Sequence, residues 1–135
     1  MSKRMTKAEF DEMSTLGAFN PVGHAILAME NDAAAAEARQ ALLDAGFEDA
    51  DILVSTSAEM FPNLDEMMRN ASGAAGFGYE ITLMRRYMTL ASKGAGWLAV
   101  YAPEDEQTAK VQSVARRLEA LSAVRYGRLL HEDLV

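Results

Sequence analysis

The sequence predicts a single α+β domain built on an antiparallel sheet. Two stretches share one design, an apolar strand followed by a helix and a second strand: residues 24–55 and residues 96–130. The chain has 135 residues, of which 50% are hydrophobic, and a chain of this size buries about two thirds of the surface that its unfolded form exposes. We therefore expect residues 1–135 to form one domain around one core.

The first unit opens with an apolar run over residues 25–29, whose consecutive apolar side chains fit a strand buried on both faces. Asn31 and Asp32 can cap the next helix, because their side-chain oxygens accept hydrogen bonds from the free N–H groups of its first turn. The residues at helical spacing are mostly small and allow close packing on the sheet: Ala35, Ala38, Leu42 and Ala45. Gly46 then ends the helix, and residues 52–55 form the second strand.

The second unit repeats this scheme from residue 96. A strand over residues 96–101 leads to Pro103, which opens a helix at a position where its missing N–H costs little. The acidic residues 104–106 suit the positive end of the helix dipole. The expected inner stripe of this helix consists of Thr108, Val111, Ala115, Leu118 and Ser122. The last strand is expected over residues 124–130, with Val124, Tyr126, Arg128 and Leu130 on one side.

Two β-α-β units with right-handed crossovers combine into a ferredoxin-like split β-α-β fold, an antiparallel sheet with strand order 4-1-3-2. The connection between strands two and three, residues 56–95, is too long to be structureless, so we expect a helical insertion there. Asn63 and Glu66 indicate the start of a first helix. A longer second helix carries an apolar stripe: Phe77, Ile81, Met84, Met88 and Ala91.

Residues 1–20 contain a short helix that we expect to lie against the domain. Thr6 and Glu9 have the spacing of a capping box, and Phe10, Met13 and Leu16 form a modest apolar side. The segment leads into no apolar signal region, and no run in the chain approaches the length of a membrane span. These features predict a cytoplasmic protein without a membrane partner.

Composition excludes several kinds of chemistry. The chain has no cysteine, so thiolate catalysis, cysteine-ligated zinc and iron–sulfur clusters are excluded. Its net charge is −7, and residues 1–67 hold 13 acidic against 4 basic residues, whereas residues 68–135 hold 7 against 9. An acidic total argues against a nucleic-acid partner, because binding the phosphate backbone needs a basic face.

The two histidines, His24 and His131, are predicted to lie at the same end of the sheet, because the last strand runs antiparallel to the first. The acidic pair Glu132 and Asp133 follows directly. Such a set could bind zinc or shuttle protons, but two histidines at one end of a sheet are more often structural. We therefore expect no metal and no cofactor, and retain both histidines as candidates for contact with a ligand or partner.

Arg85, Arg86 and Tyr87 on the long inserted helix are further candidates for ligand or partner contact, because an arginine facing the same end of the sheet could bind an anion. Consecutive helical residues point in different directions, so at most one of the two arginines shares the apolar flank. A solvated face, or pairing with the acidic first half, is the alternative. The glycine-rich residues 73–78 precede a helix but lack the order of a phosphate-binding loop, so we interpret them as a joint.

Several short sequence motifs in both halves of the chain, taken together, resemble those of a known group of domains. An Ala/Leu helix ends with Leu-Asp-Ala-Gly-Phe at residues 43–47, and Ile-Leu-Val follows at residues 52–54. Gly-Ala-Gly-Trp-Leu-Ala-Val at residues 94–100 precedes Tyr-Gly-Arg at residues 126–128 and His-Glu-Asp-Leu at residues 131–134. In these segments the chain resembles small bacterial domains of the heat-induced general stress protein (YflT) type. The resemblance implies a stress-associated cytoplasmic protein and brings no established catalytic residues.

All four predicted strands are apolar on both faces, yet the two crossover helices cover only one face. The other face must meet the insertion, the N-terminal segment or a second subunit. We therefore expect a non-catalytic binding or regulatory protein that forms a homodimer and has a protein or small-molecule partner. The alternative is a small cofactor-independent enzyme with a pocket between the sheet and the inserted helices, in which His24 or His131 acts as the base.

Overall fold

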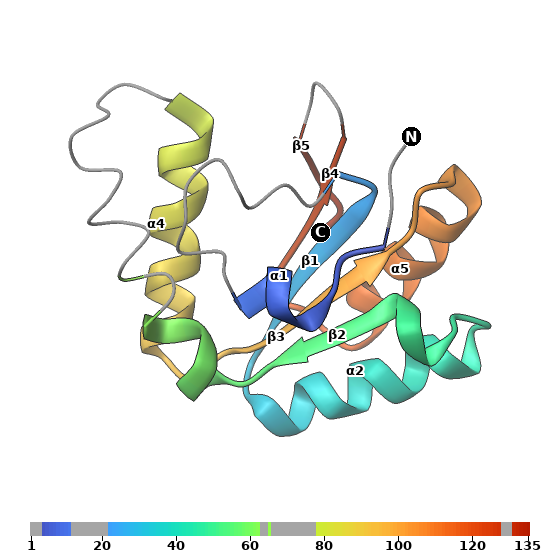
Figure 1. Ribbon diagram of the computed structural model, residues 1–135, viewed down its shortest axis with the longest axis horizontal. Coiled ribbons are helices and arrows are strands. Elements are labelled where there is room, and N and C mark those ends of the chain that lie inside the picture. The colour runs from blue at the N-terminus through green and yellow to red at the C-terminus, as the bar shows by residue number, and fades with distance from the viewer. Residues whose placement is uncertain (1–3, 12–21, 63–64, 66–77, 128–130) are drawn as a thin grey trace.

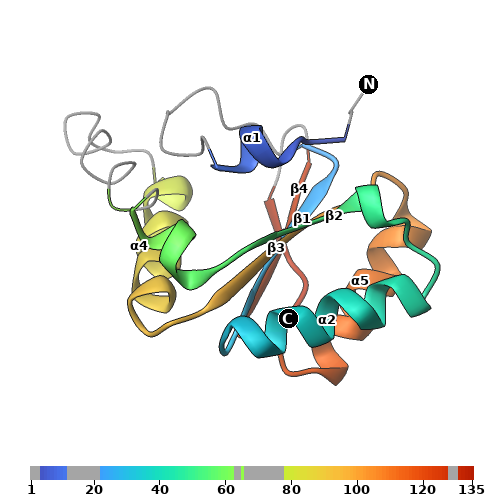
Figure 2. The ribbon, with the colours of Figure 1, turned by 60° about the horizontal axis from the view of Figure 1, so that its bottom comes forward.

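A five-stranded sheet lies between two layers of helices (Figures 1 and 2). The computed structural model describes residues 4–11, 22–62, 65, 78–127 and 131–135. The strands are β1 His24–Met29, β2 Ile52–Ser55, β3 Gly96–Tyr101, β4 Ser122–Tyr126 and β5 His131–Asp133. The helices are α1 Lys7–Asp11, α2 Asp32–Asp44, the 3-10 helix η1 Asp49–Asp51, α4 Gly78–Ser92 and α5 Asp105–Arg117, and residues 57–62 are also helical. In the described part of the chain, every helix is too short or too polar to cross a membrane.

The strand order is β2-β3-β1-β4-β5, and all neighbouring strands are antiparallel. The predicted α+β class and antiparallel sheet are confirmed. The observed order differs from the predicted one because a fifth strand, β5, lies outside β4. The other four strands follow from that edge as β4-β1-β3-β2.

The prediction of one continuous last strand over residues 124–130 is wrong. The strand β4 ends at Tyr126, and the chain returns as β5, in which His131 pairs with Tyr126 and Asp133 with Val124. Arg128 and Leu130 lie outside the described residues. The sequence His-Glu-Asp lacks the apolar pattern of a strand, but charged residues are common on edge strands, where they discourage pairing with other chains.

The helix α2 has the predicted Asn31 cap and most of the predicted inner face, whereas Asp32 is its first residue and Ala45 is a half-buried C-cap residue. The side-chain oxygen of Asn31 accepts a hydrogen bond of 2.8 Å from the N–H of Ala34. The side chains that face the sheet are fully buried: Ala35, Ala38 and Leu42. Gly46 has a φ of +107°, and the N–H of Phe47 donates to the carbonyl of Leu42, which completes a Schellman motif at the end of the helix.

Gly96 permits the close approach of α2 to the sheet. A Cβ atom at this position would lie 2.7 Å from the carbonyl oxygen of Asn31 and 2.9 Å from both the Cα of Asp32 and the Cβ of Ala35. Two of these three neighbours are backbone atoms, which cannot turn away as a flexible side chain can. The absence of a side chain at Gly96 therefore sets the distance between β3 and the first turn of α2.

The helix α5 covers the same face of the sheet beside α2 (Figure 2). Glu104 is its N-cap residue, and the N–H of Glu104 donates to the side chain of Gln107 over 3.0 Å. Its buried side chains are Thr108, Val111, Val114 and Ala115. The predicted stripe is therefore corrected at its end, because the helix stops at Arg117 and Ser122 already belongs to β4.

The opposite face of the sheet is covered by α1, the helical residues 57–62 and α4. Phe10 of α1 is 1% exposed, and Met60 lies in the same core cluster as Trp97 of β3. The N-terminal segment therefore lies against the domain, as predicted, although Met13 and Leu16 lie outside the described residues. The face that suggested a second subunit is covered by the chain itself.

The insertion differs from its prediction in two respects. The first helical segment begins at residue 57, before the predicted start at Asn63, and residues 63–64 and 66–77 lie outside the described part. The buried stripe of α4 is Leu83, Tyr87 and Ala91, whereas Met84 and Met88 are only half-buried. The predicted stripe is therefore wrong at Met84 and Met88, because α4 packs on the sheet through its Leu83 side.

We predict that Gly96→Ala lowers the free energy of unfolding by about 1–3 kcal/mol, because an added methyl group must push α2 away from β3. Gly46→Ala, at the other end of α2, is the matched control. It meets no atom closer than 3.9 Å and strains only its own backbone. Urea denaturation gives both stabilities, and amide chemical shifts should move at residues 31–35 only in Gly96→Ala. Unchanged shifts there would contradict the proposed contact.

Candidate functional site

His24 is 2% exposed at the start of β1, and both of its ring nitrogens contact backbone atoms. Its Nε2 accepts a hydrogen bond of 3.0 Å from the N–H of Met5, and its Nδ1 lies 3.2 Å from the carbonyl oxygen of Val22. A neutral imidazole has one donor and one acceptor nitrogen, so these partners select the form protonated at Nδ1. The ring also packs against Tyr101, with 5.0 Å between ring centroids.

The structure places His24 and His131 at the same end of the sheet but not beside one another. The N–H of Gly23 donates to the carbonyl of Tyr126, and Tyr126 pairs with His131, so β4 runs between the two histidine positions. Two strand spacings separate their backbones by about 10 Å. Among the described residues, no group of three His, Asp or Glu side chains could hold a metal ion.

The other candidates from the sequence attach α4 to the sheet. Arg86 forms an ion pair of 3.1 Å with Asp133 of β5. The hydroxyl of Tyr87 lies 3.1 Å from that of Tyr126 in a buried contact, and the Tyr87 ring packs edge-on against Trp97. Arg85 and Arg86 are both exposed. Arg86 contacts β5 through Asp133, and Tyr87 contacts β4 through Tyr126.

A row of buried polar side chains crosses the sheet beneath this layer. Ser55 pairs with Trp97, Trp97 with Ala28 and Ala28 with Ser122, so all four lie in register on one face. The hydroxyls of Ser55 and Ser122 and the indole N–H of Trp97 are buried, and they have no hydrogen-bond partner among the described residues. Buried polar groups of this kind commonly bind an internal water. Sequence reasoning missed the row, because only the register brings these positions together.

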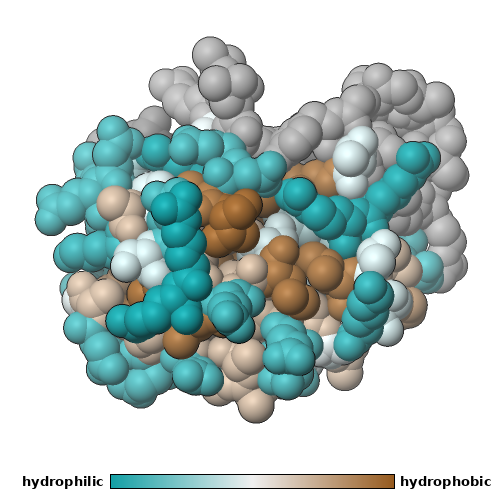
Figure 3. Space-filling view, turned by 180° about the vertical axis from the view of Figure 1, so that it is seen from behind, coloured by the Kyte–Doolittle hydropathy of each residue, from teal (hydrophilic) through white to brown (hydrophobic). Residues whose placement is uncertain are grey.

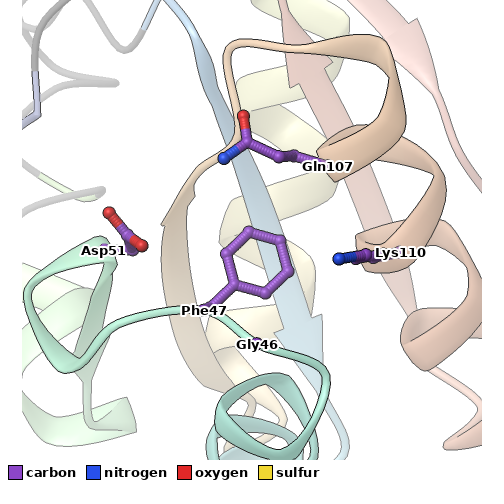
Figure 4. Close-up of a pocket in the computed structure, with 5 residues that line it drawn as sticks. All are labelled: Gly46, Phe47, Asp51, Gln107 and Lys110. Carbon is purple, nitrogen blue, oxygen red and sulfur yellow. The ribbon is translucent and has the colours of Figure 1, made fainter.

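A small cleft lies at the opposite face, between the end of α2 and α5 (Figure 4). The Phe47 ring stands in its middle, with the amino group of Lys110 on one side and the Asp51 carboxylate on the other. Arg4 and the N–H of Glu48 already bind that carboxylate. The cleft has room for a volume of only about 60 Å³, far below the roughly 300–1,000 Å³ of typical ligand pockets. The cleft is therefore large enough only for a small ion or a few waters.

A capping box that the sequence reasoning overlooked begins the helical residues 57–62. The N–H of Thr56 donates to the Glu59 carboxylate over 2.9 Å, and the N–H of Glu59 donates to the Thr56 hydroxyl. The Thr56 N–H lowers the pKa of Glu59, and the Thr56 hydroxyl and Lys7 act in the same direction against a raising effect of burial. The spacing Thr-x-x-Glu before Met60 is the signal that could have located this helix start.

Comparisons of the chain with protein-family models, curated proteins and solved structures give no match. The arrangement of its own residues is therefore the basis for a functional proposal.

We predict that Glu59→Gln destabilises the protein by about 0.5 kcal/mol at pH 7, since the carboxylate is half-exposed and screened by solvent. The pKa of Glu59 is lowered in the folded state, so its charge stabilises the fold above the ordinary carboxyl range and ceases to do so as the pH falls through the folded pKa. Urea denaturation at pH 7 and pH 3 should show the difference only at pH 7. Glu37→Gln, on the exposed side of α2, controls for net charge.

We predict a coupling of about 1 kcal/mol between the hydroxyls of Tyr87 and Tyr126. Each change to phenylalanine alone removes a partner from a buried hydroxyl, so the double variant should lose less stability than the sum of the two single variants. Urea denaturation of the four proteins measures this difference. Strictly additive losses would contradict a direct hydrogen bond.

Proposed function

We propose that the protein is a non-catalytic, cytoplasmic binding or regulatory protein. The observation that carries the proposal is the environment of His24, whose Nδ1 and Nε2 both contact backbone atoms of the same chain. A general base needs a nitrogen within hydrogen-bond reach of a substrate proton. Because Met5 occupies the acceptor nitrogen, the geometry supports a role in attaching the N-terminal segment rather than in proton transfer.

The partner-binding part of the proposal rests on how the second face of the sheet is covered. Its cover comes from the N-terminus and from the connection between β2 and β3 rather than from the β-α-β crossovers. Several polar contacts that attach this cover are part-exposed, including Arg86 with Asp133 and Arg4 with Glu48, and exposed ion pairs contribute about 0–1 kcal/mol each. These exposed contacts can rearrange on binding at modest cost, while the apolar side chains of the layer stay buried in the core.

The homodimer proposed from the sequence needs a different interface from the one first expected, because the α4 face of the sheet is buried within one chain. Seen from behind, the apolar side chains appear in several separate areas divided by polar ones (Figure 3). Light scattering on the purified protein decides the point. A mass near 14.7 kDa would agree with a face covered within one chain, and twice that mass would require an interface on another surface.

Two further proposals concern the fold family and the biological role of the protein. We propose a ferredoxin-like core extended by β5, supported by the pairing of β1 with β3 and β4 and of β2 with β3. We also propose a stress-associated role, supported by the segments that resemble YflT-type domains.

The rival proposal is a cofactor-independent enzyme with His24 or His131 as the base, and with His24 in that role it makes the opposite prediction for one variant. It expects His24→Ala to abolish turnover with little change in stability. We expect a loss of about 1–3 kcal/mol instead, because the N–H of Met5 loses its buried acceptor. Urea denaturation measures the loss, and His131→Ala is the control for removal of an imidazole.

A thermal-shift screen of metal ions, nucleotides and small organic acids tests binding directly. A ligand at 100 times its dissociation constant adds about 2.7 kcal/mol to stability and raises the melting temperature by several degrees. We expect a ligand found in this way to bind without being converted. Conversion of it by the wild type, lost in His24→Ala at unchanged stability, would overturn the non-catalytic proposal.

A further inference from the structure

Residues 4–11, which we call the N-terminal strap, are tied to the sheet by polar contacts with three elements. Arg4 forms ion pairs of 3.0 Å with Asp51 of η1 and 3.3 Å with the neighbouring Glu48. The N–H of Met5 donates to His24 of β1. Lys7 donates over 2.8 Å to the carbonyl of Val54 in β2. The contact through His24 is the buried one, whereas Arg4 and Lys7 are 45% and 40% exposed.

The strap is also part of the core, so its release has consequences for the sheet. Met5 and Phe10 are 7% and 1% exposed and belong to the cluster that contains Ile26 of β1 and Trp97 of β3. Detachment of the strap would expose these apolar side chains and part of the sheet face beneath them.

The Met5 contact depends on the protonation state of His24. In the neutral ring the Nε2 lone pair accepts the Met5 N–H, but a protonated imidazole carries hydrogens on both nitrogens and accepts at neither. Protonation would therefore place two N–H groups against each other at a 3.0 Å separation in a buried site. The ring can gain its proton only by breaking the hydrogen bond to the strap.

Among the described residues, the Tyr101 ring packs against His24, the carbonyl of Tyr126 binds the preceding Gly23, and the strap beside Met5 carries the charged Arg4 and Lys7. Tyr87 contacts the Tyr126 hydroxyl, and Glu48 and Asp51 contact Arg4. Tyrosine and arginine side chains ordinarily keep one charge state between pH 5 and pH 8, the range in which imidazoles titrate. The Arg4 ion pairs hold the strap through contacts that do not involve the ring. His131 lies beyond Tyr126 and needs its own control.

We propose that His24 is a pH-sensitive latch that holds the N-terminal strap on the sheet when neutral and releases it when protonated. The sign follows from linkage: the His24 ring is neutral in the closed state and takes up one additional proton in the open state, so release increases as the pH falls. The latch does not rest on the proposed binding function. Release of the strap depends on the protonation of His24 and not on the identity of a partner.

Hydrogen exchange of the strap amides tests the latch on the whole chain between pH 8 and pH 5, after correction for the intrinsic pH dependence of exchange. We expect the open fraction of residues 5–11 to rise up to tenfold for each pH unit below the onset, the limit for one proton. In His24→Gln the amide oxygen can replace Nε2 as the acceptor without titrating, so the open fraction should vary less than twofold. An unchanged pH response in this variant would overturn the proposal.

Two further variants distinguish the effect of His24 from the effects of His131 and of the Arg4 ion pair. His131→Gln should keep the wild-type pH response, and loss of the response there would assign it to the wrong histidine. Asp51→Asn weakens the Arg4 contact and should raise the open fraction equally at every pH in the range. A changed pH dependence in Asp51→Asn would contradict control by His24.

A measurement on the wild type keeps the proposal testable if His24→Gln fails to fold. Long-range ¹⁵N–¹H spectra of the histidine rings report the tautomer and the titration of His24 directly. We expect the form protonated at Nδ1 at pH 8 and a ring titration that coincides with the opening of the strap. A ring protonated at Nε2 at pH 8, or a titration that leaves the strap amides unaffected, would overturn the latch.

Discussion

Burial of the central strands on both faces is the constraint on which the rest of this structure depends. All six residues of β1 are buried, as are the first five residues of β3. Apolar side chains on both faces of a sheet must be covered on both sides. The crossover helices α2 and α5 cover one face, and the chain uses its N-terminal strap and the long connection after β2 to cover the other. The insertion is therefore part of the core.

The second layer also explains the residues that looked chemically active in the sequence. His24, Arg86 and Tyr87 all form contacts between this layer and the sheet or its edge. A histidine, an arginine and a tyrosine have the donors and acceptors that such contacts need, and the same groups suggest catalysis or anion binding when only the sequence is considered. His24 combines a structural and a chemical role in the proposed latch, because its contact with the strap is made through a titratable ring.

Local signals account for the parts of the fold that the sequence predicted well. The strands β1 and β3 are consecutive apolar runs, and the N-cap of α2 is the adjacent Asn31. For α5 the start was predicted at Pro103, but the N-cap is Glu104. These features depend on neighbours within a few residues, so they can be recognised without the rest of the chain. The elements that were missed depend on distant partners. The charged strand β5 exists because the edge of β4 is available for pairing, and the inward side of α4 is chosen by contact with Trp97.

The candidate site also has features that local sequence signals predicted and features that depend on distant partners. The sequence by itself determined the α+β class and the antiparallel sheet. It also placed His24 and His131 at one end of the sheet, but from a last strand to residue 130 that in fact ends at Tyr126. Only the tertiary structure decided that Tyr126 lies between the two histidines, that Ser55, Trp97 and Ser122 share one buried row, and that Met5 occupies Nε2 of His24. The physical reason is that strand register and the docking of the strap join residues far apart in the chain. Hydropathy patterns and caps carry no information about such pairings.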